Sequence, residues 1–340
     1  MSPAARRRLL ALAKLLLGLA LAAAVVRWLA PDLGALVDRV RLDLAGLALG
    51  FAMTVVTALV VSLRWKLMVE AMGGTRLPFA VYLHGLALTK VVGQVTSTLA
   101  MDLVGRGLAL RSAGATGGIG LATVQALLER LFDVLLPIAM LAWAIAVLRA
   151  AAGPAAAIAG FTALCLLSAA LAAIILWPLT RVALRGYLAL RRRLGRAPAD
   201  PAALAGPPPI SRLLAAQVGL LGVLRYVALV PCYWGVAWAL GLAIDARAIA
   251  LGMPLGQLAA VIGVTPGALG FQEAGWTGAL RWVGGLDDLT IGAFVLGLRV
   301  LVAAYFALLY ALTWPLAQIA RRRSRLDHLD RAADVDADEL

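Results

Sequence analysis

Long apolar runs separated by short charged segments dominate this 340-residue sequence. A membrane-spanning helix needs about 20 predominantly apolar residues, and the runs approach or exceed this length. Six of them are predicted to be full spans: Leu15–Leu29, Leu44–Leu63, Leu121–Leu148, Ala155–Pro178, Leu213–Leu242 and Ile291–Ile319. The pattern predicts an all-α integral membrane protein, with a polytopic membrane domain over residues 1–320 and a short charged cytoplasmic tail over residues 321–340.

The first apolar run follows a basic N-terminus that contains Arg6, Arg7 and Arg8. A basic start before an apolar core is also typical of a secretory signal peptide. No clear small-residue cleavage site precedes Pro31, so we favour an uncleaved first span whose N-terminus lies in the cytoplasm.

A broken apolar segment follows residue 260. Its backbone-breaking residues are Pro266, Gly267 and Gly270, and the carboxylate of Glu273 comes next. Proline removes a backbone donor and glycine weakens a helix, so a straight span is not expected. Broken backbone at membrane depth is tolerated only inside protein or beside a water-filled cavity. We interpret the segment as a re-entrant hairpin with Glu273 at the start of its returning half-helix. The alternative is a kinked packing helix whose Glu273 reaches the headgroups.

The region Leu77–Leu110 is too polar for a helix that faces lipid. It contains Lys90, Asp102 and Arg106, and a lysine or aspartate costs roughly 2.5–3.5 kcal/mol at the centre of a membrane helix. Asp102 and Arg106 are four residues apart and share one helix face. We predict a second re-entrant hairpin here, and a surface-lying amphipathic helix is the alternative.

The distribution of arginine predicts the sidedness of the spans. Basic segments at 64–76, 181–196 and 321–325 should face the cytoplasm, where they would meet anionic lipids. Because all three basic segments lie on the same side, one hairpin must enter and leave from the inner face and the other from the outer face. The result is six spans plus two re-entrant hairpins, about eight membrane segments, in an inverted repeat such as many transporters use. Both termini are then cytoplasmic.

Ionisable side chains inside the apolar background are the candidate functional residues. Glu129 and Asp133 share a helix face, whereas Arg130 points about 100° away. Such groups are costly in a membrane and usually functional. The alternative is an internal ion pair that holds neighbouring helices together. The residues predicted to bind a substrate are Asp102, Arg106, Glu129, Arg130, Asp133, Gln272 and Glu273.

Composition narrows the class of protein further. The chain is 63% hydrophobic, and its formal net charge of +13 comes from arginines beside the spans, so nucleic-acid binding is not expected. Cys165 and Cys232 lie in apolar runs, and the two histidines lack ligand spacing, so neither a metal nor another cofactor is predicted. The alanine- and arginine-rich composition suggests a protein of a bacterial cytoplasmic membrane.

Several elements together resemble a known family. They are Arg64-Trp65, Asp102-x-x-x-Arg106, Glu129-Arg130-x-x-Asp133 and Thr265-Pro-Gly-x-x-Gly-x-Gln-Glu273. Their order and spacing are similar to the lysylphosphatidylglycerol synthase transmembrane region, a flippase-like membrane module. Gln272 stands where the family usually has arginine. The resemblance implies movement of a lipid or lipid-linked molecule between leaflets. It implies no synthase activity for this chain, which shows no soluble aminoacyl-transferase domain.

Two classes of function are compatible with these features of the sequence. The first is a flippase-like, non-enzymatic protein that moves a lipid or lipid-linked headgroup through a polar cavity between the hairpins. The second is a non-transporting membrane partner of an envelope-lipid or glycan enzyme, docked through its basic loop. An intramembrane enzyme using Asp287 and Asp288 is a weaker third reading, because no second ligand group accompanies them. The oligomeric state is left open, with a homo-oligomer as one option.

Overall fold

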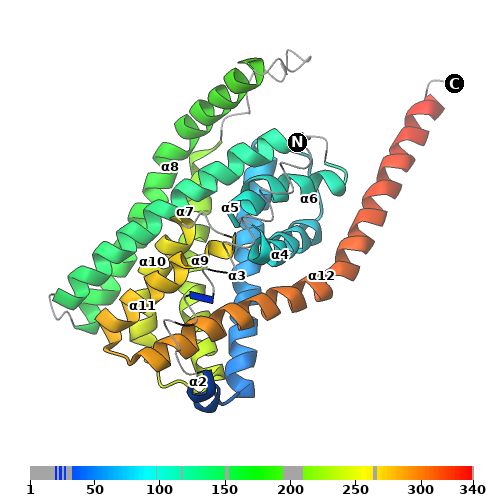
Figure 1. Cartoon of the computed structure of the whole chain (residues 1–340). Coiled ribbons are helices and arrows are strands. Elements are labelled where there is room, and N and C mark those ends of the chain that lie inside the picture. The colour runs from blue at the N-terminus through cyan, green and yellow to red at the C-terminus, as the bar shows by residue number, and fades with distance from the viewer. Residues whose placement is uncertain are drawn as a thin grey trace, which may run out of the picture.

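The computed structural model describes residues 33–96, 98–115, 118–149, 153–193, 210–262 and 266–338, and the isolated residues 20, 23, 24 and 27. All regular structure in these ranges is helical (Figure 1). The predicted first span, Leu15–Leu29, falls almost entirely outside the described residues.

Within the described ranges, five helices are long and apolar enough to cross a membrane. They are α3 (Leu44–Ala71), α7 (Gly118–Arg149), α8 (Pro154–Arg193), α9 (Arg212–Ala239) and α12 (Asp288–Asp338). These helices coincide with five of the six spans that the sequence predicts. The chain is therefore an all-α, multi-pass membrane protein.

A helical hairpin occupies each of the two regions where the sequence predicts one. The first consists of α4 (Phe79–Val95), the short α5 (Thr98–Ala100), a π-helical turn (Met101–Gly105) and α6 (Arg106–Ser112). The second consists of α10 (Ala246–Ile262), a 3₁₀ turn (Pro266–Ala268) and α11 (Phe271–Gly284). In both, the outgoing and returning helices pack against each other.

The tips of the two hairpins meet. The backbone N–H of Gly267 in the second tip donates to the carbonyl of Thr96 in the first, at 2.9 Å. Gly267 has a φ of +58°, which a glycine adopts at little cost, and Gly270 has a φ of +84° directly before α11. The glycines that the sequence marks as breaks thus permit the turn and the close approach.

The first hairpin is enclosed by protein. Its helix α4 packs against α3 and α12, and Tyr82, Leu86 and Ala87 are almost fully buried. The polar side chains of His84 and Thr89 are buried as well, and His84 lies 3.2 Å from the hydroxyl of Thr313 in α12. This burial is not that of a surface-lying amphipathic helix, which would keep a polar face in water.

Helices α3 and α9 pair closely because small residues line their contact. A Cβ added to Gly235 of α9 would lie 2.7 Å from the backbone nitrogen of Gly50, and one added to Gly46 of α3 would lie still closer to the backbone nitrogen of Ala239. Small residues four apart allow membrane helices to approach to backbone contact. The Gly46-x-x-x-Gly50 step on α3 is part of this contact.

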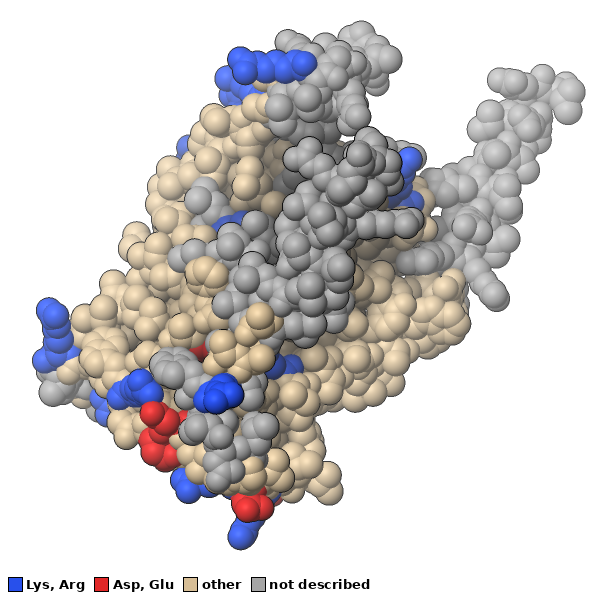
Figure 2. Space-filling view, viewed as in Figure 1, with Lys and Arg blue, Asp and Glu red and all other residues tan. Residues whose placement is uncertain are grey.

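The outer surface fits a membrane environment. Leu166, Ile174 and Val300 are among many large apolar side chains that are more than half exposed. In the view of Figure 2, acidic and basic side chains gather at the end that carries α2 (Leu33–Arg39), and uncharged residues cover most of the middle. The charged tail after residue 320 continues α12 as helix to Asp338 (Figure 1).

Candidate functional site

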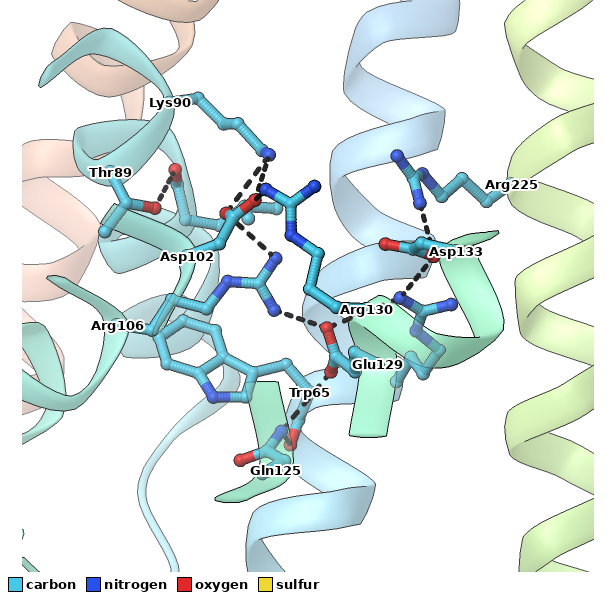
Figure 3. Close-up of polar contacts among 12 residues, drawn as sticks. Trp65, Thr89, Lys90, Asp102, Arg106, Gln125, Glu129, Arg130, Asp133 and Arg225 are labelled. Atoms are coloured by element: carbon cyan, nitrogen blue, oxygen red, sulfur yellow. Dashed lines mark hydrogen bonds and ion pairs between the residues drawn. The ribbon is translucent and has the colours of Figure 1, made fainter. Parts of the chain in front are cut away.

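Asp102 lies at the centre of a buried ion cluster. Its carboxylate accepts from Lys90 of α4 at 3.2 Å, from Arg106 of α6 at 3.4 Å and, still closer, from Arg130 of α7 (Figure 3). Asp102 is 6% exposed, so these three cations compensate a carboxylate that water barely reaches. Such compensation is needed because an unpaired buried charge is strongly destabilising.

A second part of the cluster centres on Asp133 of α7. Arg225 of α9 donates to it at 2.7 Å, and Arg64 of α3 at 3.2 Å. Between the two parts, Glu129 binds Arg106 at 2.5 Å and Arg64 at 3.4 Å. The first hairpin, α3, α7 and α9 thus meet through charged side chains.

Local structure explains how Asp102 and Arg106 reach this cluster. The N–H of Arg106 bonds to the carbonyl of Met101, which closes the wider turn of a π-helix. Single π-helical turns are frequent at functional sites. The guanidinium of Arg106 also lies 5.5 Å from the ring centroid of Trp65, a distance that allows a cation–π contact. The backbone break and the aromatic ring therefore fix the direction of Arg106.

A polar cavity of about 170 Å³ opens beside the cluster. It extends from the ion cluster on one side to the second hairpin tip on the other, where Gly267, Ala268 and Gln272 line it. Its charged lining consists of Lys90, Asp102, Arg106, Arg130, Asp133 and Arg225. The cavity lies between the two hairpins and contacts α3, α9 and α12.

The carboxylate of Glu273 has a different surrounding from the one the sequence suggests. It accepts the N–H of Gly270 at 2.7 Å, as a cap on the first turn of α11, and forms an ion pair with Arg299 of α12. Arg299 also donates to the carbonyl of Gly267 at 2.8 Å. Glu273 is thus at the start of the returning helix, as predicted, but it faces Arg299 and does not line the cavity.

An apolar cavity of about 80 Å³ adjoins the cluster from the opposite side. Its lining comes from α3, α7, α8 and α9, and it ends at Arg64, Glu129 and Asp133. Leu135 and Leu167, which belong to the lining, are 41% and 63% exposed on the outer surface of the helices. Asp133 is shared with the polar cavity.

The structure therefore brings Asp102, Arg106, Glu129, Arg130 and Asp133 together in one ion cluster. It places Gln272 in the cavity wall opposite and gives Pro266, Gly267 and Gly270 to the second tip. The alternative reading of an internal ion pair is partly right, because every carboxylate of the cluster binds at least one arginine.

Several members of the cluster are absent from the sequence-based set. They are Arg64, Lys90, Arg225 and, beside the second tip, Arg299. Each is a cation within or beside an apolar helix, and such a position is by itself a signal of function. Arg64 and Trp65 resemble an interfacial anchor at the end of an apolar run. In the structure they are 2% and 1% exposed, because α3 continues to Ala71 and α4 and α7 pack against it.

No protein-family model, curated protein or solved structure matches the chain. The similarity to the lysylphosphatidylglycerol synthase transmembrane region stays a prediction from the sequence elements.

Proposed function

We propose that the protein binds an anionic headgroup of a lipid or lipid-linked molecule in the polar cavity and moves it between leaflets, as a flippase-like transporter. The observation that carries this proposal is the cationic lining of a cavity enclosed by membrane helices: Lys90, Arg106, Arg130 and Arg225 against two carboxylates. Arginine donates paired hydrogen bonds to phosphate oxygens, so this lining suits a phosphate group.

Asp102 allows the cations of the cavity to exchange one anionic partner for another. It binds three cations, and a phosphate entering the cavity would compete with it for the same donors. The cations need not stay unpaired at any stage, which matters where water is scarce. Movement of a charged headgroup through the protein would then replace one set of ion pairs with another.

The adjoining apolar cavity supports a lipid rather than a free anion. Its leucine-rich lining extends from the outer surface of α7 and α8 to the carboxylate that the polar cavity shares. A hydrocarbon chain in this cavity would remove no polar group from water. The headgroup of the same molecule would then lie near the arginines.

The topology that belongs to this proposal has six spans and two re-entrant hairpins in an inverted repeat, with both termini in the cytoplasm of a bacterial cell. Single cysteines at Ser211 and Asp245, in a background without Cys165 and Cys232, test it by labelling in intact cells. External labelling at Asp245 and protection at Ser211 are expected. The reverse result would reject the topology.

Transport is tested with the purified protein in liposomes that contain a fluorescent phospholipid, by following how much of it becomes accessible to a membrane-impermeant quencher. Wild type should exchange lipid between leaflets, and Arg130→Ala should not. Arg281→Gln, in an exposed ion pair with Asp288, is the control for an arginine outside the cavity. If Arg130→Ala exchanges lipid as fast as wild type, the cavity is not the route. A protein that exchanges no lipid but supports an envelope enzyme would favour the partner hypothesis.

A further inference from the structure

The charges around the polar cavity do not balance. The described residues that line it include four cations, Lys90, Arg106, Arg130 and Arg225, but only two carboxylates, Asp102 and Asp133. The neighbouring Arg64 and Glu129 add one charge of each sign, so the excess among these residues stays at two positive charges.

The excess of two positive charges is divided between the surroundings of Asp102 and those of Asp133. Lys90 and Arg130 share Asp102 on one side, while Arg225 binds Asp133 on the other (Figure 3). Arg64 shares Asp133 with Arg225. The pair of Arg106 and Glu129 between them is neutral. Each side therefore holds one cation more than it has carboxylates.

Two uncompensated positive charges are costly within a membrane domain, because burial removes the water that would solvate them. A phosphodiester carries one negative charge and would leave one of the two excess positive charges uncompensated. A headgroup with two linked phosphates carries a negative charge for each side of the cavity. We infer that the cavity is selective for a lipid-linked diphosphate over a phospholipid with a single phosphodiester. This inference rests on the proposed function, of which it names the substrate class.

The test compares two lipids with identical dioleoyl chains, binding to the purified full-length protein in detergent and measured by microscale thermophoresis. CDP-diacylglycerol is a diphosphate diester with two negative charges, and phosphatidylglycerol has one. Wild type should bind CDP-diacylglycerol at least about tenfold more tightly, the equivalent of one further charge-assisted hydrogen bond. Equal affinity for the two lipids overturns the inference, even when the protein still exchanges phospholipid between leaflets.

Two variants each remove one excess charge without leaving a carboxylate unpaired. Arg225→Gln leaves Asp133 with Arg64, and Lys90→Gln leaves Asp102 with Arg106 and Arg130. Both should therefore fold, and each should weaken CDP-diacylglycerol binding about ten- to a hundredfold while phosphatidylglycerol binding changes much less. Arg281→Gln should leave both affinities unchanged. Selectivity that survives both cavity variants overturns the inference.

Inorganic diphosphate separates the lipid from the free anion. It should bind far more weakly than CDP-diacylglycerol, because it cannot use the apolar cavity. Inorganic diphosphate that binds as tightly, with sensitivity to Arg225→Gln, would contradict the lipid part of the proposed function and reassign the cavity to a free anion.

Discussion

The backbone N–H of Gly267 donates to the carbonyl of Thr96 at 2.9 Å, although 171 positions separate the two residues in the sequence. This bond joins the tips of the two hairpins at one wall of the polar cavity. Hydrogen bonds between backbones resist competition poorly when water reaches them and well when it does not. The contact is therefore a place where the cavity can be held closed.

Gly267→Ala is expected to weaken this contact. A Cβ at this position would lie 2.9 Å from the carbonyl oxygen of Gln94, so the tips must separate. Gly285 is a matched control, because its φ of +57° is nearly the same as the +58° of Gly267 and nothing lies within 4 Å of its added Cβ. Both variants carry a strain of about 1–2 kcal/mol. Only Gly267→Ala should also increase labelling of a cysteine placed at Gln272 in the cavity wall. Equal labelling in the two variants would contradict a closed tip contact.

Glu273 and Arg299 should be strongly coupled in stability. Arg299 joins Glu273 to the Gly267 carbonyl, so Arg299→Gln leaves the 2% exposed carboxylate of Glu273 without its cation. A loss of about 3 kcal/mol is expected for this variant. The double variant with Glu273→Gln should recover part of it, because a glutamine oxygen still accepts from Gly270. The measurement is a double-mutant cycle of thermal unfolding in detergent. Strictly additive effects would show that the pair contributes nothing beyond its parts.

Substitution by alanine should have opposite effects at Gly235, in the contact between α3 and α9, and at Gly278, which lies outside it on α11. Gly235→Ala would place a methyl group 2.7 Å from the Gly50 backbone and should destabilise by about 1–3 kcal/mol through overpacking. Gly278→Ala, on an exposed face of α11 with nothing within 4 Å, should be neutral or should stabilise by up to about 1 kcal/mol from helix propensity. Thermal unfolding of both variants checks this. A stable Gly235→Ala would mean that the helices are not in backbone contact.

Hydrophobic pattern and backbone breaks were sufficient to predict the five long apolar helices and the two helical hairpins that the structure describes. Pro266 and the glycines after it cannot continue a helix, and the polar residues of Leu77–Leu110 cannot face lipid, so both regions are visible in the sequence alone. Glu273 is likewise placed correctly in the first turn of α11. These features depend on local chemistry, which neighbouring residues in the chain determine.

The partners of the charged side chains could not be predicted in the same way. Arg64 meets Asp133 and Arg299 meets Glu273 because helices distant in sequence pack side by side, and no spacing rule within one helix reports this. Arg64-Trp65 even suggests an interface anchor, since its burial depends on α4 and α7 covering that part of α3. The excess of cations in the cavity follows from the structure alone, because it depends on which side chains lie together.

Asp287 should make the contact between α2 and α12 dependent on pH. It caps the start of α12, and hydrogen bonds from the side chain and backbone N–H of Thr290, with Arg39 nearby, hold the pKa of Asp287 below its usual range. A carboxyl group with a lowered pKa in the folded state stabilises above its unfolded value of about 3.9, and this contribution is lost as the pH falls below it.

The comparison for Asp287 is with Asp287→Asn, whose amide oxygen can still cap the helix but does not titrate. Apparent melting temperatures of both proteins are measured at one scan rate between neutral pH and about pH 3, below the unfolded pKa. Wild type should be the more stable at neutral pH, and the difference should shrink as the pH falls. A difference that is constant over this range would show that the negative charge contributes no stability.

Arg64 and Lys66 are two positions apart on α3 and form ion pairs that differ in burial. The two pairs should therefore differ in how much they stabilise the fold. The side chain of Arg64 is 3% exposed and binds Glu129 and Asp133, whereas Lys66 is 26% exposed and pairs with Glu70 one turn later. Arg64→Met removes two buried charge-assisted hydrogen bonds but leaves Glu129 with Arg106 and Asp133 with Arg225, so it should cost about 1.5–3 kcal/mol. Lys66→Met removes a partly solvated pair and should cost less than about 1 kcal/mol. Thermal unfolding in detergent compares the two, and Arg64→Lys shows whether charge alone restores stability. It should do so only in part, because a lysine cannot bridge two carboxylates with the fixed fork of a guanidinium. If Arg64→Met were as mild as Lys66→Met, burial would not increase the stabilisation that an ion pair on α3 provides.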